Sequence, residues 1–265
     1  MIPLVCIDVD GTLVGATGEV AEPVWEAVDA ALARGHHLAL STARGAFGAS
    51  WHMAKRLDPD GWHVFHAGGA VVHAGTSMVE DHAVSSADID ASARIAAERN
   101  WVIEYYSAAD YTVASDSKAA IDHAALLGVP FAARSLVDLD GAVVRVQFVV
   151  DEEEISDVAH AVRDLDVTVT SATSPIMPGT AFVSATRRGV TKATGIATIA
   201  GQLGLRMTDV MMIGDGLNDL PALEAVGHPV AMGNAAPEVH EVAAHHVADV
   251  ERHGVVEALE IARIG

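Results

Sequence analysis

The chain has 265 residues, 51% of them hydrophobic, which is enough for one large domain or two smaller ones. Sixteen Lys and Arg against 36 Asp and Glu give a formal net charge of −20, and a field of that sign argues against nucleic-acid binding. The single cysteine excludes an intramolecular disulfide and a cysteine-based zinc cluster, and it suits a reducing compartment. A local cation could still admit a small anionic substrate to one pocket.

No stretch of the sequence is long and apolar enough to predict a membrane span. The apolar start of the chain ends at Asp8 and has no basic residues before it, so a signal peptide is not expected. These features predict a cytoplasmic protein that does not bind a membrane.

The first 45 residues predict a strand, a helix and a second strand. Residues 4–9 form a short apolar run that ends in Asp-Gly, the pattern of a buried strand entering a loop. Glu22-Pro23 then begins a helix with apolar residues at helical spacing, and Gly35 ends it. Residues 37–41 are the next apolar run. Because a β-α-β order favours parallel pairing, we expect a parallel sheet.

The middle of the chain interrupts this alternation. From about Val79 the pattern is that of an α+β domain with hairpins, and from Gly189 the α/β alternation returns. We therefore predict an α/β fold with a doubly wound, Rossmann-like core of residues 1–79 and 187–265, and an inserted domain of residues 80–186. The further elements expected are helices over 49–57, 85–100, 117–127, 152–165, 192–203, 219–226, 237–243 and 255–263, and strands over 64–65, 70–73, 102–106, 111–114, 143–150, 167–170, 181–185, 210–213 and 229–232.

Two aspartates directly follow the first predicted strand, in Asp8-Val9-Asp10-Gly11-Thr12. Residues two apart on a strand share a face, so both carboxylates can serve one centre where the strand ends. Ligand sites of doubly wound sheets lie at this end of the strands. The alternative is an Asx-rich turn after a buried strand.

A second acidic group, Gly214-Asp215-Gly216-Leu217-Asn218-Asp219, follows the strand predicted over residues 210–213. Carboxylates crowded together raise one another's pKa, so the group is costly without a cation. Hard oxygen ligands at this density suit Mg²⁺ better than zinc. The alternative is that Asp219 only caps the next helix.

Thr42 and Arg44 follow the second strand, and Lys192 begins a helix after the inserted domain. Each is a weak signal alone, since a threonine after a strand is usually a cap and a helical lysine is usually solvated. All of these groups, however, lie at strand–helix junctions of one predicted sheet. Two acids, a metal cluster, a hydroxyl and a lysine gathered there suit phosphoryl transfer, in which a carboxylate attacks phosphorus and cations stabilise the charge.

Taken in order, these motifs resemble those of the haloacid dehalogenase superfamily of phosphohydrolases, and within it the Cof-type sugar phosphatases with a class IIB α/β cap. The resemblance spans almost the whole chain and implies an Mg²⁺-dependent phosphatase of small phosphorylated metabolites, sugar phosphates in particular. The inserted domain would be the cap that sets substrate specificity. The matching motifs are Asp8-Val9-Asp10-Gly11-Thr12, Ser41-Thr42-Ala43-Arg44, Gly189-Val190-Thr191-Lys192, Gly214-Asp215-Gly216-Leu217-Asn218-Asp219 and Ala231-Met232-Gly233-Asn234-Ala235.

The resemblance implies catalytic roles for four matching residues. Asp8 would be the nucleophile that forms an aspartyl-phosphate. Asp10 would protonate the leaving oxygen and then act as the base for the hydrolytic water. Thr42 would hydrogen-bond the phosphoryl group, and Lys192 would neutralise the charge on the nucleophile and the phosphoryl group.

The resemblance also implies a metal site and a set of substrate contacts. Mg²⁺ would bind the Asp8 carboxylate, the Asp10 backbone carbonyl and Asp215, with Asp219 assisting. The residues expected near the phosphate or the leaving group are Gly11, Thr12, Arg44 and Asn218.

Three other hypotheses are open at the level of sequence. A phosphomutase on the same scaffold shares the chemistry until the phosphoryl-enzyme meets a sugar hydroxyl in place of water. A non-catalytic module that binds phosphorylated metabolites would not need the whole set of acids, hydroxyl and lysine. A dehalogenase would have no use for Asp10 or the acidic metal cluster.

The fourteen histidines show no spacing typical of a metal site. The oligomeric state, monomer or homodimer, is left open by the sequence.

Overall fold

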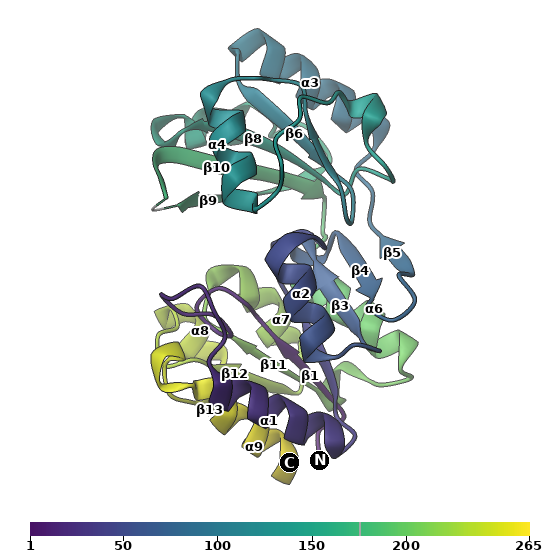
Figure 1. The fold of residues 1–265 in the computed structure, drawn as a ribbon, viewed down its shortest axis with the longest axis vertical. Helices are drawn as coiled ribbons and strands as arrows, with labels where there is room; N and C mark the ends of the chain where they lie inside the picture. Colours follow the sequence, from purple (N-terminus) through teal and green to yellow (C-terminus); the bar gives the residue numbers. More distant parts are fainter. Residues whose placement is uncertain (175) are drawn as a thin grey trace. The chain divides into compact units, whose positions relative to one another are not determined.

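The computed structural model of the protein describes residues 1–174 and 176–265, and their contacts form two compact units (Figure 1). Unit 1 contains Met1–Arg44, His52–Glu80 and Thr191–Gly265. Unit 2 contains Gly45–Trp51 and Asp81–Val190. Among the described residues, no helix is long and apolar enough to cross a membrane.

Unit 1 is built on a five-stranded parallel sheet in the order β13-β12-β11-β1-β2. Its central strands, β1 and β11, are entirely buried, and Cys6 pairs with Met212 on one side and Ala39 on the other. A central strand of a parallel sheet is covered on both faces, which explains the continuous apolar runs in the sequence. The strands are β1 (Leu4–Ile7), β2 (His37–Leu40), β11 (Val210–Gly214), β12 (His228–Ala231) and β13 (His245–His246).

Helices cover both faces of this sheet (Figure 1). On one face, Cys6 and Met212 share a core with Ile196, Leu223 and Val239, which come from three different helices. The pair α1 and α9 packs together on the other side. The predicted doubly wound core is therefore confirmed. The helices of this unit are α1 (Glu22–Ala33), α6 (Lys192–Gln202), α7 (Leu220–Ala225), α8 (Pro237–Val242) and α9 (Gly254–Ile264), and α2 (Gly48–Leu57) has residues in both units.

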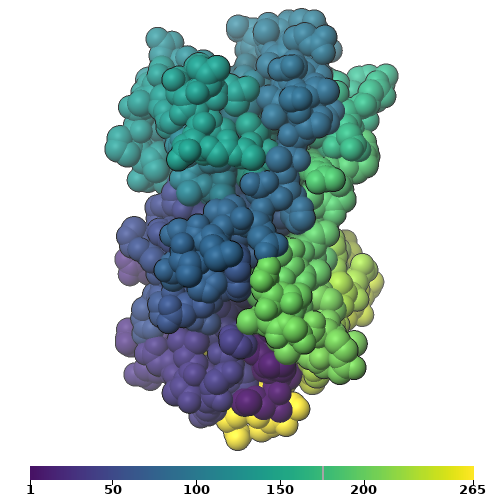
Figure 2. Space-filling model, turned by 90° about the vertical axis from the view of Figure 1, so that its right-hand side faces the viewer, coloured from purple at the N-terminus to yellow at the C-terminus, as the bar shows by residue number. Residues whose placement is uncertain are grey.

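The two ends of the chain meet in unit 1. Figure 2 shows the purple N-terminal segment beside the yellow C-terminal helix, and Ile2 N–H donates a hydrogen bond to the Ala262 carbonyl at 3.0 Å. A small sheet in the order β3-β4-β5 completes the unit, with β3 and β4 antiparallel. Its strands are β3 (Trp62–Phe65), β4 (Ala70–His73) and β5 (Val79–Asp81), the last of which ends in unit 2.

Unit 2 is an antiparallel sheet in the order β7-β6-β8-β10-β9. Apolar residues of α3 and α5 cover one face, and α4 covers part of the other with Ala120 and Ala124 against Tyr106. The elements are α3 (Ser86–Arg99), β6 (Val102–Tyr106), β7 (Tyr111–Val113), α4 (Lys118–Leu127), β8 (Arg145–Asp151), α5 (Ile155–Ala161), β9 (Val167–Ser174) and β10 (Met177–Arg187).

Local sequence signals set the ends of the helices in unit 2. Ser85 caps α3 by accepting a hydrogen bond from Asp88 N–H at 3.1 Å, and Asn100 ends that helix in the left-handed conformation. The helix expected over residues 152–165 is shorter than predicted. It begins as a 3₁₀ turn at Glu152–Glu154 and ends at Ala161, with the β-branched Val162 as its C-cap.

A buried polar cluster lies between the sheet of unit 2 and α4. The Glu104 carboxylate accepts hydrogen bonds from Tyr106 Oη at 2.6 Å, His123 Nδ1 at 2.9 Å and Gln147 Nε2 at 2.9 Å. All four side chains are buried, and His123 also stacks on Phe182. Both oxygens of the carboxylate thereby have hydrogen-bond partners, as buried polar groups generally do.

The short segment Gly45–Trp51 belongs to unit 2 although it directly follows Arg44 of unit 1. Ala46 N–H donates to the Ala108 carbonyl at 2.9 Å, and the Phe47 ring stacks on Tyr106 and Tyr111. No sequence pattern indicated this placement, since it depends on aromatic contacts with residues about 60 positions further along the chain.

Candidate active site

A buried lysine joins two aspartates where the strands of the parallel sheet end. Lys192 is the first residue of α6, Asp8 directly follows β1, and Asp219 directly precedes α7. The lysine Nζ lies 2.5 Å from Asp8 Oδ1 and 2.6 Å from Asp219 Oδ1, with all three side chains buried. Because a buried charge is stable only when paired, this arrangement fixes the three groups relative to one another.

Asp219 also shapes the loop that follows β11. Its second oxygen, Oδ2, accepts hydrogen bonds from Asp215 N–H at 3.1 Å and Gly216 N–H at 3.0 Å. Both of its oxygens are therefore engaged, one by Lys192 and one by the backbone. This makes Asp219 chiefly a support for the loop that carries Asp215.

Residues of the loop after β1 hold the Asp215 side chain in place. Thr12 Oγ1 donates to Asp215 Oδ1 at 2.7 Å. Gly11 has a φ of +88°, and a Cβ at that position would lie 2.7 Å from Cγ of Asp215. Only glycine fits this turn without strain or collision, which explains the Asp-Gly-Thr order. Thr12, expected at the substrate, thus contacts Asp215 in the structure.

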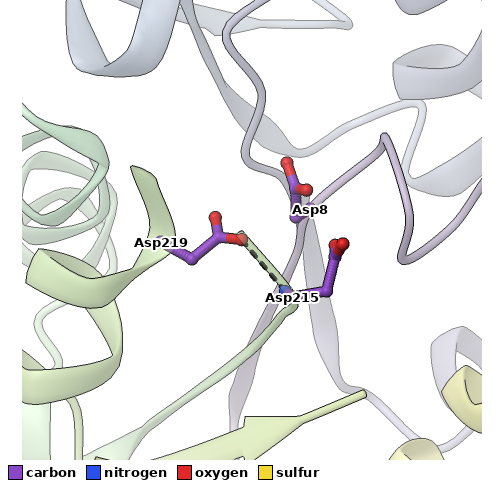
Figure 3. Close-up of side chains that lie close together, drawn as sticks. All are labelled: Asp8, Asp215 and Asp219. Carbon is purple, nitrogen blue, oxygen red and sulfur yellow. Dashed lines mark hydrogen bonds between the residues drawn. The ribbon is translucent and has the colours of Figure 1, made fainter. Parts of the chain in front are cut away.

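The three aspartates converge on one place, as Figure 3 shows for Asp8, Asp215 and Asp219. Each offers an oxygen, and the three oxygens lie within 4.8 Å of one another. Carboxylate oxygens at this spacing fit a small hard divalent cation. The side chain of Asp10 is not part of this group, and the predicted contact through its backbone carbonyl stays a prediction.

The electrostatics of the cluster also favour a cation. Burial raises the pKa of Asp8 to about 7 even though Lys192 acts to lower it. Burial likewise raises the pKa of Asp215 to about 6, against the effect of the Thr12 hydrogen bond. Burial alone would lower the pKa of Lys192, but the charges of Asp8 and Asp219 outweigh it and raise that pKa. A bound cation would relieve the crowding of negative charge.

Asp10 and Arg44 form an ion pair beside this cluster. Arg44 donates from Nε at 3.0 Å and from Nη2 at 2.5 Å to the two oxygens of Asp10. The side chains are partly open to solvent, at 37% for Arg44 and 63% for Asp10. The structure therefore gives Arg44 a carboxylate partner, while the predicted contact of Arg44 with the phosphate or leaving group stays a prediction.

The remaining predicted residues lie in the same loops. Thr42 is buried, its N–H donates to the Val64 carbonyl at 3.0 Å, and its Oγ1 accepts from Arg44 N–H at 3.1 Å. Asn218 is exposed in the 3₁₀ turn Leu217–Asp219. Their roles toward a phosphate stay predictions.

One residue of the site was missed as a functional residue. Asn234 follows β12, and its side-chain amide contacts the loops that carry Gly11 and Asp215. The stretch Ala231-Met232-Gly233-Asn234-Ala235 matched a family motif. A role for the asparagine could not be predicted from it, because that role depends on contacts between loops that are far apart in sequence.

A doubly wound α/β core with an acidic cluster and a buried lysine at the carboxyl ends of its strands defines an enzyme suited to phosphoryl transfer. The chain belongs to the haloacid dehalogenase-like hydrolases, because the model of that family matches residues 5–259. The family membership predicted from the motifs is thereby confirmed, and the protein is a phosphatase of this family.

Several known proteins are similar over nearly the full chain. YxeH of Bacillus subtilis, which carries a phosphatase name, is 28% identical over 98% of this chain and 97% of its own. The subclass IIB sugar phosphatase BT4131 has a structure with a TM-score of 0.80 at 22% identity, covering 99% of both chains. A haloacid dehalogenase-like hydrolase from Bacteroides thetaiotaomicron has a TM-score of 0.86 at 22% identity, covering 100% of both. At these identities the two structures show the fold.

Proposed function

We propose that this phosphatase hydrolyses small phosphorylated metabolites, sugar phosphates in particular, in an Mg²⁺-dependent reaction with an aspartyl-phosphate intermediate on Asp8. The observation that carries the proposal is the buried Lys192, whose Nζ bridges Asp8 and Asp219 beside Asp215. The name of BT4131 as a sugar phosphatase supports the substrate class.

In the first step, a carboxylate oxygen of Asp8 attacks phosphorus and the bond from phosphorus to the leaving oxygen breaks. Asp10 donates a proton to that oxygen, which leaves as an alcohol. In the second step, Asp10 takes a proton from water, and the water oxygen attacks phosphorus. The bond from phosphorus to Asp8 breaks, inorganic phosphate leaves and Asp8 is restored.

The residues around Asp8 have supporting roles. Lys192 holds the nucleophilic carboxylate in place and offsets the charge that gathers on the phosphoryl group. The Thr42 hydroxyl, Gly11, Thr12 and Asn218 are proposed to bind the phosphoryl oxygens. Arg44 orients Asp10 or meets the leaving group.

The carboxylates of the site fit a divalent cation, and we propose Mg²⁺ because all ligands are oxygen. Asp8, the Asp10 carbonyl and Asp215 would hold it, with Asp219 behind Asp215. The bound cation would supply positive charge to the phosphoryl oxygens during transfer.

We further propose that residues 80–186 act as the cap domain that sets specificity for the leaving group, while residues 1–79 and 187–265 carry the chemistry.

A phosphate-release assay over a panel of phosphorylated metabolites tests this function. Activity should require Mg²⁺, disappear with a chelator and return when Mg²⁺ is added back. Asp8→Asn keeps the shape but removes the attacking charge, so turnover should fall by several powers of ten. Near-full phosphate release by Asp8→Asn would exclude the covalent mechanism. Isomerised sugar phosphate with little free phosphate would identify a phosphomutase instead.

A further inference from the structure

Asn234 lies at the point where three loops of unit 1 meet. We propose that it is a positioning residue that holds Asp215 and the backbone at Gly11 in the arrangement needed to bind the metal. The proposal rests on the proposed function, because it concerns the same acidic cluster. It concerns a residue that contacts the metal ligands and is not itself one of them.

The side-chain amide of Asn234 makes three contacts. Its Nδ2 donates to the Gly11 carbonyl at 2.8 Å and lies 3.4 Å from Asp215 Oδ2. Its Oδ1 accepts from Val250 N–H at 2.9 Å. The contact with Val250 requires an oxygen at that end of the amide, so the nitrogen must face Gly11 and Asp215.

These contacts complete the support of the Asp215 carboxylate. Thr12 donates to its Oδ1 at 2.7 Å, and Asn234 approaches its Oδ2 from the other side. The backbone of the same loop adds support, since Ala236 N–H donates to the Asp215 carbonyl at 2.9 Å. The carboxylate therefore has a donor near each oxygen and a fixed main chain.

The contact with Gly11 links this support to the nucleophile loop. Gly11 follows Asp10, whose carbonyl is a proposed metal ligand, and its turn leaves no room for a Cβ beside Asp215. One amide thus fixes the spacing between ligands from two separate strands. Groups that orient metal ligands in this way typically change metal affinity by about 10- to 100-fold when removed.

Asn234 is exposed to solvent. Its role in holding the metal ligands can therefore be distinguished from a role in folding. Hydrogen bonds of exposed side chains contribute little to the free energy of unfolding, because water replaces the lost partner. Removing the amide should therefore weaken metal binding much more than it lowers the melting temperature.

The test measures Mn²⁺ binding to the purified full chain by the EPR signal of free Mn²⁺. The variants are Asn234→Ala and Asn234→Leu, the second of which keeps the branched shape of the side chain without the amide. The matched control is Gln202→Ala, which removes another exposed side-chain amide that donates to a carboxylate, that of Glu80. Gln202 ends the helix that Lys192 begins, about 15 Å away along the helix axis. Asp215→Ala is the reference for loss of the site.

We expect both Asn234 variants to raise the dissociation constant for Mn²⁺ by about tenfold or more, with the control unchanged. The Mg²⁺ concentration for half-maximal phosphatase activity should rise in the same ratio, while kcat at saturating Mg²⁺ stays near that of the wild type. Unchanged Mn²⁺ binding in both variants would overturn the proposal alone. Wild-type protein that binds Mn²⁺ no better than Asp215→Ala would overturn the metal site of the proposed function, and this proposal with it.

Discussion

Replacing Lys192 with methionine would leave two buried aspartates without the cation they share. Methionine has a similar length and no charge, so the change removes the ion pairs with little loss of packing volume. Removing one partner of a buried ion pair costs roughly 3–5 kcal/mol, because a charge is left buried and uncompensated. That free energy corresponds to roughly two to four powers of ten in the unfolding equilibrium of unit 1.

The single cysteine provides an assay confined to unit 1. Cys6 lies in β1 and is fully buried, and burial raises the pKa of its thiol, so the folded protein should resist alkylation. The rate of reaction with N-ethylmaleimide then reports how often unit 1 opens. In the presence of a chelator and above pH 8, alkylation of Lys192→Met should exceed that of the wild type by roughly two powers of ten or more.

The destabilisation caused by Lys192→Met should depend on pH. Burial raises the pKa of Asp8 to about 7 in the folded protein, and the loss of Lys192 removes an interaction that lowers it. Near pH 6 the carboxyl of the variant is protonated, so the penalty should shrink as the pH falls. The double variant Lys192→Met with Asp8→Asn should recover part of the loss. An increase in alkylation below tenfold above pH 8 would contradict a charged, desolvated cluster.

Two further predictions concern buried groups outside the cluster. His63 accepts from Leu40 N–H, and burial lowers its pKa to about 4, so the unfolded chain takes up a proton first as the pH falls below about 6.5. The free energy of unfolding should fall by up to about 3 kcal/mol on acidification. Urea unfolding of His63→Gln should show a weaker dependence of that free energy on pH than the wild type. Parallel pH profiles of the two proteins would contradict a neutral His63. In unit 2, Glu104→Ala removes the carboxylate that accepts from three buried side chains and should destabilise that unit by a few kcal/mol. Hydrogen exchange should quicken in unit 2 while Cys6 alkylation stays unchanged, and equal changes in both units would show that they unfold together.

Local sequence signals predicted the elements that place the site. The apolar run over residues 4–9 appears as β1 (Leu4–Ile7), and the acids that follow lie where the strand ends. The same holds for Val210–Gly214 and the acidic loop after it. These features were predictable because strand burial and the position of an Asp-Gly turn depend on neighbouring residues in the chain.

The sequence did not predict the contacts between residues that are far apart along the chain. The ion pair of Arg44 with Asp10 depends on how two loops approach each other, and neither residue signals its partner. The contacts of Asn234 with Gly11 span more than 200 residues of chain. The placement of Phe47 in unit 2 likewise follows from ring stacking with Tyr106 and Tyr111. Such contacts are decided by packing in three dimensions, which residue spacing does not encode.

The most direct test of the proposed mechanism is to look for the phosphoryl group on Asp8. The enzyme is mixed with Mg²⁺ and a sugar phosphate, quenched in acid during the first turnover, digested and analysed by mass spectrometry. The account predicts one added phosphoryl group on the peptide that contains Asp8, and none in Asp8→Asn. A first turnover that releases phosphate with no phosphorylated Asp8 peptide, or with the group on another residue, would contradict it.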